Sequence, residues 1–206
     1  MADSIWPLVH AERAALADDL SGIDEAAWRT PSLCDGWSVQ QALAHQVSTA
    51  TLTPLTFVAS FVASGFRFPA FAQKGIARFG SGSPEATLAA FRAVQTSTSA
   101  PPGPTTSWLG EALVHAEDIR RPLGITRGYP LEAVTRTLDF YSGSNALIGT
   151  KKRITGVTLK ATDTTWSHGD GPAVEGPAMS LLMAATGRKA ALADLTGPGV
   201  EVLRGR

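Results

Sequence analysis

The apolar positions of the first 150 residues recur mostly at helical spacing, which predicts a series of amphipathic helices. Helices are expected over residues 4–20, 83–95, about 106–122 and about 130–147. Residues 57–82 are apolar too, but glycine and proline interrupt them, and a mobile loop or a lid is one interpretation of this segment. Four or five helices with short connectors favour a helical bundle.

Two helix starts carry clear capping signals. Ser38 is followed three residues later by Gln41, the spacing of a capping box, and opens a helix that Pro54 should end or kink. The run Ser83-Pro84-Glu85 supplies a cap, a proline at the first helical position and an acid in the first turn. These signals place one helix after residue 38 and another after residue 83.

The periodicity changes near residue 150. Alternating apolar and polar residues predict a strand over 154–161, and Val174 is expected in a second, short strand. Helices are expected over 177–185 and 188–195, followed by a last strand at 200–203.

The predicted fold class is therefore α+β. An up-down helical bundle over residues 1–150 is expected to precede a small C-terminal α/β domain over residues 151–206. A unit of about fifty residues is near the limit of independent stability, so the second domain should pack against the first.

Composition excludes several classes of protein. With 44% apolar and 17% charged residues, the chain can bury a substantial core and is not expected to be disordered. Acidic and basic residues balance at 18 each, and no basic stripe suggests a nucleic-acid partner. No apolar run is long enough to span a bilayer, and Met1-Ala2-Asp3-Ser4 lacks the features of a signal peptide. Cys34 is the single cysteine, which excludes an internal disulfide and fits a cytoplasmic location.

The most informative chemical feature is a pair of ligating residue types four positions apart. Glu111 and His115 fall in a predicted helix, where side chains at i and i+4 lie on one face. His45 lies on the inward face of another predicted helix and is a candidate third ligand. Two histidines and a glutamate suit a zinc-type site with one position open for water or substrate. The alternative from the residues alone is that such an inward histidine is a hydrogen-bonded core residue.

The segment from Trp28 to Val39, with Leu33-Cys34-Asp35-Gly36-Trp37 at its centre, resembles the opening signature of mycothiol-dependent maleylpyruvate isomerase-like proteins. These proteins belong to the DinB-like superfamily of metal-binding four-helix bundles. Residues 111–121, 162–169, 187–188 and 197–200 also resemble segments of the family. The resemblance implies zinc, or another divalent metal, held by His45, Glu111 and His115. It also implies mycothiol, the thiol of actinobacteria, as cosubstrate.

The implied function is a zinc-dependent enzyme that activates mycothiol as a metal-bound thiolate, which adds to a small electrophile. Release of the thiol after a bond rotation gives an isomerase, and retention of the thiol gives an S-transferase. Two alternatives stay open: a non-catalytic bundle protein that binds a small molecule or a metal, and a hydrolase whose metal activates water. No nucleic acid or membrane partner is expected, and the protein is expected to be a monomer or a homodimer.

Two charged residues have competing interpretations. Arg188 matches a family arginine and is a candidate catalytic residue that binds a carboxylate of the substrate or of mycothiol. Its alternative is a cation that complements the dipole of a helix end. Asp118 either supports His115 from behind or pairs with Arg120 or Arg121.

Four other residues are expected to have structural roles. Cys34 is interpreted as a packed small hydrophobe rather than a redox-sensitive thiol, and Trp37 as a core anchor. His168 is placed in a turn, and His10 in a structural position on the first helix.

Overall fold

The computed structural model describes residues 4–145 and 148–206. Residues 1–3 and the end of the helix expected near residue 147 lie outside these ranges. The chain forms two compact units, Met1–Thr126 and Arg127–Arg206. This division precedes the expected boundary at residue 150, because helix α7 (Leu131–Ser142) packs against α9 (Ala178–Ala185) in the second unit. The domain boundary itself stays a prediction.

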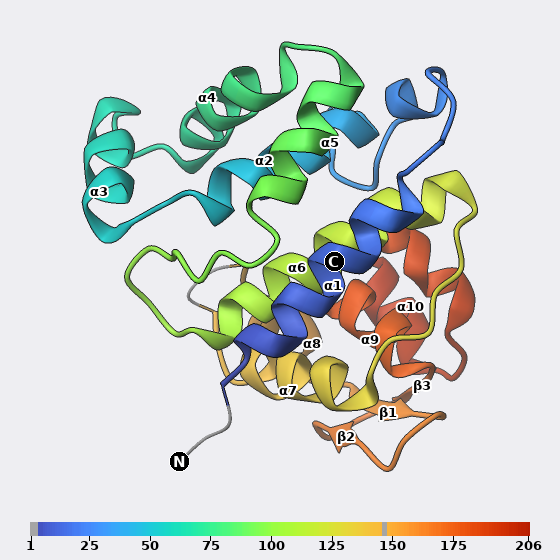
Figure 1. The fold of residues 1–206 in the computed structure, drawn as a ribbon. Coiled ribbons are helices and arrows are strands. Elements are labelled where there is room, and N and C mark those ends of the chain that lie inside the picture. The colour runs from blue at the N-terminus through green and yellow to red at the C-terminus, as the bar shows by residue number, and fades with distance from the viewer. Residues whose placement is uncertain (1–3, 146–147) are drawn as a thin grey trace. The chain divides into compact units, whose positions relative to one another are not determined.

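The core of the first unit is formed by helices α1 (Trp6–Asp19), α2 (Val39–Ala50), α5 (Pro84–Ala93) and α6 (Thr106–Arg120) (Figure 1). α1 packs against α5 and α6, and α2 packs against the same two helices. This mutual packing makes a bundle, as expected. Its apolar centre includes Leu16, Leu20, Trp28, Leu43, Val47, Phe91 and Ile119.

Both predicted helix starts are confirmed. Ser38 Oγ accepts a hydrogen bond from the Gln41 backbone N–H at 3.3 Å, and Gln41 Oε1 accepts one from the Ser38 N–H at 2.9 Å. α2 ends at Ala50, so Pro54 follows the helix and begins the next one. Ser83 caps α5 by accepting from the N–H of residue 86.

Residues 57–82 are not an irregular loop. They fall in two helices, α3 (Pro54–Ala63) and α4 (Phe68–Gly80), and the turn between them uses positive φ angles at Gly65 and Phe66. Gly75 serves packing, because a Cβ at this position would lie 2.1 Å from Ser48 Oγ on α2. The glycines that suggested a loop therefore allow a turn and a close helix contact.

Helix α3 contributes no buried residue to the core. Among the described residues, no single helix is long and apolar enough to cross a membrane. Only α3 and α4 taken together reach the required length and apolarity, and they are bent by 110°.

A buried ion pair joins α1 to α6. Arg120 is fully buried; its Nη1 donates to Glu12 Oε1, and its Nε donates to Asp19 Oδ2 at 2.7 Å. Two carboxylates thus hold the arginine inside the bundle, where an unpaired charge would be costly.

The second unit contains a three-stranded sheet in the order β2-β1-β3. β1 (Thr158–Ala161) runs antiparallel to β2 (Ser167–His168) and parallel to β3 (Ala173–Gly176), and α9 packs against β1 and β3. The segment Lys189–Asp194 is a 3₁₀ helix, labelled η3. The α+β prediction is confirmed.

Two predictions for this unit are wrong. Helix α8 (Thr150–Ile154) takes the start of the expected strand at 154–161, which begins only at Thr158. The expected last strand at 200–203 is helix α10 (Gly199–Arg204). Val200 and Leu203 are buried while Glu201 is exposed, so the burial follows the spacing of a helix rather than the alternation of a strand.

Candidate metal centre

The three expected ligands meet inside the first unit. His45 lies on α2, and Glu111 and His115 lie one turn apart on α6. One donor atom from each residue lies within 4.8 Å of the other two. The His45 Nε2 atom is 3.1 Å from Glu111 Oε1, and the His115 Nε2 atom is 3.5 Å from Glu111 Oε2.

These separations fit a shared metal ion. Two ligands on a tetrahedral zinc, each about 2.1 Å from the ion, are about 3.4 Å apart. Glu111 Oε1 is buried and has no hydrogen-bond partner among the described residues, so its approach to His45 is a charge contact rather than an aligned hydrogen bond. A cation between the carboxylate and the two imidazoles would satisfy this oxygen. The residues therefore fit a divalent metal of the zinc type.

Asp118 fixes the orientation of His115. The His115 Nδ1–H donates to Asp118 Oδ2 at 2.9 Å, and the Asp118 side chain is fully buried. With the proton on Nδ1, the lone pair of neutral His115 is on Nε2, the atom that faces Glu111. A carboxylate behind a ligating histidine is the usual arrangement at zinc sites. Of the two interpretations of Asp118, support of His115 is observed, while Arg120 pairs with other carboxylates.

A tight turn brings the signature segment against α6. The Trp37 N–H donates to Cys34 O at 3.0 Å, and Gly36 occupies the third position of this turn with φ of 75°. Type II turns require such an angle, which glycine adopts without strain. The Leu33 N–H donates to Asp118 O at 2.9 Å and ties the loop to the helix.

Cys34 is part of the site rather than only a packed hydrophobe. Its thiol donates to Asp118 Oδ2 at 3.0 Å, and its Sγ lies 3.4 Å from His115 Nδ1. Cys34, His115 and Asp118 form a second group of potential ligands that uses the opposite nitrogen of the same imidazole. Hydrogen bonds from the Cys34 thiol and from His115 Nδ1 to Asp118 explain these short contacts without a metal. We therefore assign Cys34 and Asp118 to the support of His115 and not to the metal.

Two further residues border the site and were not predicted to do so. The Trp37 ring lies against His45 with centroids 4.9 Å apart, and 6.4 Å from the His115 ring. Arg13 on α1 is 3% exposed and donates to the backbone oxygen of Ser97 at 2.9 Å. The positions of Trp37 and Arg13 depend on tertiary contacts, which no local sequence pattern indicates.

The pKa values of Glu111 and His115 are each shifted by the charge of the other residue. Burial alone would raise the pKa of Glu111, but the nearby charges of His115 and His45 hold that pKa well below its usual value. Burial alone would lower the pKa of His115, but Glu111 and the hydrogen bond to Asp118 raise it well above its usual value. Burial also lowers the pKa of Arg13, and the charge of Glu111 opposes this shift. Without metal, both shifts favour an ionised Glu111 beside a protonated His115.

The remaining candidate residues lie on other elements of the chain. Arg188 belongs to the second unit, where its Nη1 donates to Thr186 O at 3.1 Å before η3. The pKa of Arg153 is lowered mainly by burial and, to a smaller extent, by the charge of Arg188. His168 lies in strand β2 and stacks on Trp166, and His10 Nε2 contacts Ser97 O at 3.3 Å.

Comparison with protein families identifies the bundle. Residues 9–100 match the family model described as Mycothiol maleylpyruvate isomerase N-terminal domain. The first part of the chain is thus similar to the N-terminal domain of this family. The matched region includes His45 and the signature segment, whereas Glu111 and His115 follow it.

Solved structures extend the likeness of fold to most of the chain. A crystal structure of the mycothiol-dependent maleylpyruvate isomerase superposes with a TM-score of 0.65 at 18% identity, covering 94% of this chain and 91% of that one. A histidine-to-alanine mutant of that enzyme gives a TM-score of 0.63 at the same identity and coverage. At this identity the likeness shows a shared fold. No curated protein sequence gives a significant match.

Proposed function

We propose that this protein is a zinc-dependent enzyme that activates mycothiol for addition to a small electrophile, as an isomerase or an S-transferase. The observation that carries the proposal is the convergence of His45, Glu111 and His115, with His115 held from behind by a buried carboxylate. The family name and the fold of the mycothiol-dependent maleylpyruvate isomerase support the choice of thiol.

The three proposed ligands have distinct tasks. Glu111 supplies the negative charge, and its uncompensated Oε1 makes the site attractive to a cation. Asp118 keeps the proton of His115 on Nδ1, so that Nε2 is free to bind. Zinc bound here would lower the pKa of a thiol at its open position and favour the thiolate.

The chain's other residues would shape the place of reaction. The Trp37 ring lies against the His45 imidazole, with ring centroids 4.9 Å apart, and 6.4 Å from that of His115, so it would form an apolar wall beside a bound ion. The Cys34 thiol donates a hydrogen bond to Asp118. In this proposal the reacting thiol is therefore that of mycothiol and not that of Cys34. Arg188 is proposed to bind a carboxylate of the substrate or of mycothiol. The proposed location is the cytoplasm of an actinobacterium.

The decisive experiment follows the thiol through a reaction. Zinc-loaded protein is incubated with mycothiol and a panel of cis-configured and other small electrophiles, and both substrate and free thiol are quantified. An isomerase changes the electrophile without net loss of thiol, whereas an S-transferase consumes thiol in proportion to product. His45→Ala serves as the ligand-deficient control and is expected to lose the activity.

Turnover without thiol would contradict the proposal and identify a hydrolase. No turnover with any electrophile, together with retained binding of a small molecule, would favour the non-catalytic alternative. Both outcomes leave the metal assignment to be judged separately, because metal content is measured independently of turnover.

A further inference from the structure

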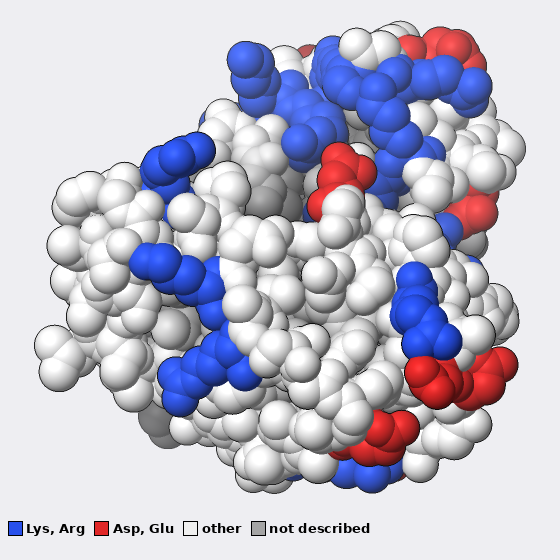
Figure 2. Space-filling model, turned by 90° about the horizontal axis from the view of Figure 1, so that it is seen from above, with Lys and Arg blue, Asp and Glu red and all other residues white. Residues whose placement is uncertain are grey.

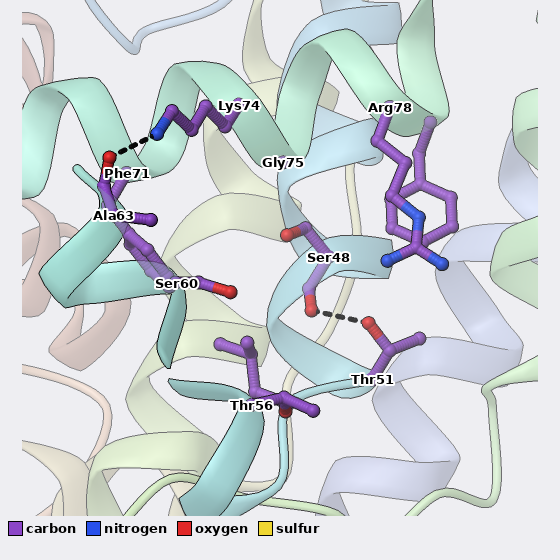
Figure 3. Close-up of a pocket in the computed structure, with 11 residues that line it drawn as sticks. Ser48, Thr51, Thr56, Ser60, Ala63, Phe71, Lys74, Gly75 and Arg78 are labelled. Atoms are coloured by element: carbon purple, nitrogen blue, oxygen red, sulfur yellow. Dashed lines mark hydrogen bonds between the residues drawn. The ribbon is translucent and has the colours of Figure 1, made fainter. Parts of the chain in front are cut away.

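A pocket of about 380 Å³ lies between α2, α3 and α4. It shares no residue with the candidate metal centre. Figure 3 shows side chains from the three helices directed into it, including Ser48 and Thr51 at the end of α2, Ser60 on α3, and Arg78 on α4. The lining is rich in hydroxyl groups and contains two cations, Lys74 and Arg78, but no carboxylate.

Several hydrogen-bond donors of this pocket are unused by the described part of the chain. The Arg78 guanidinium forms no hydrogen bond or ion pair there, and it lies over the Phe79 ring at 5.0 Å. Lys74 Nζ donates to Ala63 O at 2.6 Å, which leaves two of its three protons. The hydroxyls of Ser48 and Ser60 likewise donate to no described residue. Two cations and two hydroxyls thus present spare donors to one cavity.

The surroundings are positive because the sequence holds no acid here. Residues 36–84 contain no aspartate or glutamate, but they contain Arg67, Lys74 and Arg78. Figure 2 shows the same asymmetry: the left part of this view, where α3 and α4 lie, carries basic side chains and no acidic ones. An anion that enters the pocket therefore meets no local negative charge.

The wall of the pocket includes a close contact between two helices. Gly75 on α4 and Ser48 on α2 both line the pocket, and a Cβ at position 75 would lie 2.1 Å from the Ser48 hydroxyl oxygen. A side chain at position 75 would therefore collide with this hydroxyl.

We propose that this pocket binds a phosphate group. Two cations match the charge of a phosphate monoester, and its three terminal oxygens can accept from a guanidinium, an ammonium and serine hydroxyls at once. A carboxylate, with a single charge and two oxygens, would leave some of these donors unused. The phosphate has two potential sources, a soluble phosphate monoester or an anionic lipid headgroup. Exposed Leu55, Val58 and Phe66 on the same helical hairpin make the lipid source worth testing.

The first arm of the test titrates ¹⁵N-labelled protein with inorganic phosphate at constant ionic strength, with chloride as reference. Saturable shifts are expected for amides of residues 48–60 and 71–79. Arg78→Gln removes a charge-assisted contact and should weaken binding about tenfold or more. Arg92→Gln removes an exposed arginine of α5 outside the pocket and should leave the affinity unchanged. Thermal unfolding of both variants checks that each is folded.

The second arm measures cosedimentation with phosphatidylcholine vesicles that contain phosphatidic acid, beside pure phosphatidylcholine. Binding that needs phosphatidic acid, that phosphate displaces and that Arg78→Gln weakens assigns the phosphate to a lipid. Saturable shifts with inorganic phosphate and no vesicle binding assign it to a soluble ligand. Shifts no larger than those with chloride and no vesicle binding would overturn the proposal, as would equal binding by the Arg78→Gln and Arg92→Gln proteins.

Discussion

Replacing Asp118 by asparagine tests how the metal centre is held. The buried carboxylate accepts the Nδ1 proton of His115 at 2.9 Å and the thiol proton of Cys34 at 3.0 Å. Asparagine keeps the shape but removes the charge. Its amide can also turn a donor toward Nδ1, which would move the His115 proton to Nε2 and block the ligating atom.

The expected loss follows from the geometry. A hydrogen bond to a charged group is worth about 1.5–3 kcal/mol and about twice a neutral one, so removal of the charge costs about 0.8–1.5 kcal/mol. That energy corresponds to about a four- to tenfold loss of zinc affinity. The change of tautomer adds to it, and loss of a carboxylate behind a ligating histidine typically costs about ten- to a hundredfold. We therefore expect Asp118→Asn to bind zinc about ten- to a hundredfold more weakly than the parent.

The assay is a competition titration with a chromophoric zinc chelator at fixed pH. Cys34→Ala is the matched control, because it removes the other group bonded to Asp118 and leaves the contact with His115 intact. The zinc affinity of this control should lie within about threefold of that of the parent. This change is smaller than the loss of affinity expected when a carboxylate behind a ligating histidine is removed. Unchanged affinity in Asp118→Asn would refute the role of Asp118. Loss of zinc in Cys34→Ala would instead make the cysteine a ligand.

Four further predictions concern stability and pH. Arg120→Leu leaves two carboxylates without their buried cation and should lower the free energy of unfolding by about 3–5 kcal/mol, measured with urea; an effect within error would contradict the ion-pair assignment. Gly75→Ala drives a Cβ into Ser48, so its overpacking cost of about 1–3 kcal/mol should exceed the gain in helix propensity; a more stable variant would contradict it. Zinc must displace the proton of His115, whose pKa is raised, so the apparent affinity should rise with pH by about tenfold per unit near neutrality, and a flat profile in chelator competition would exclude this proton exchange. For the apoprotein the sign is reversed: the charged pair of His115 and Glu111 stabilises the fold at neutral pH, and this contribution is lost as pH rises through the raised pKa of His115.

Signals that act over a few residues were sufficient to predict much of the bundle. The Ser38–Gln41 capping box and the Ser83-Pro84-Glu85 start are satisfied within one helical turn, so the sequence contains all of their partners. The spacing of Glu111 and His115 is likewise a local property of one helix. The meeting of this pair with His45 depends on packing between α2 and α6. The residue types made His45 a candidate third ligand, and the family resemblance strengthened that expectation.

The errors occur where a distant contact decides the structure. Glycine disfavours helix by local preference, but Gly75 lies within α4. Its lack of a side chain allows α2 to approach α4 closely at this position. Cys34 next to Leu33 suggested simple packing, since its thiol partner Asp118 lies 84 positions along the chain. Val200 and Leu203 were expected in a strand, but both are buried on α10, which packs against β3. Two buried residues three positions apart fit one turn of a helix.

The most direct test of the central claim is the metal content of the protein, measured by mass spectrometry after purification without a metal-affinity tag. The account predicts about one zinc per chain, as a three-ligand site requires, and loss of that zinc in both His45→Ala and Glu111→Ala. Both variants should remain folded by circular dichroism. A parent protein that contains no metal and takes up none from micromolar zinc would contradict the account.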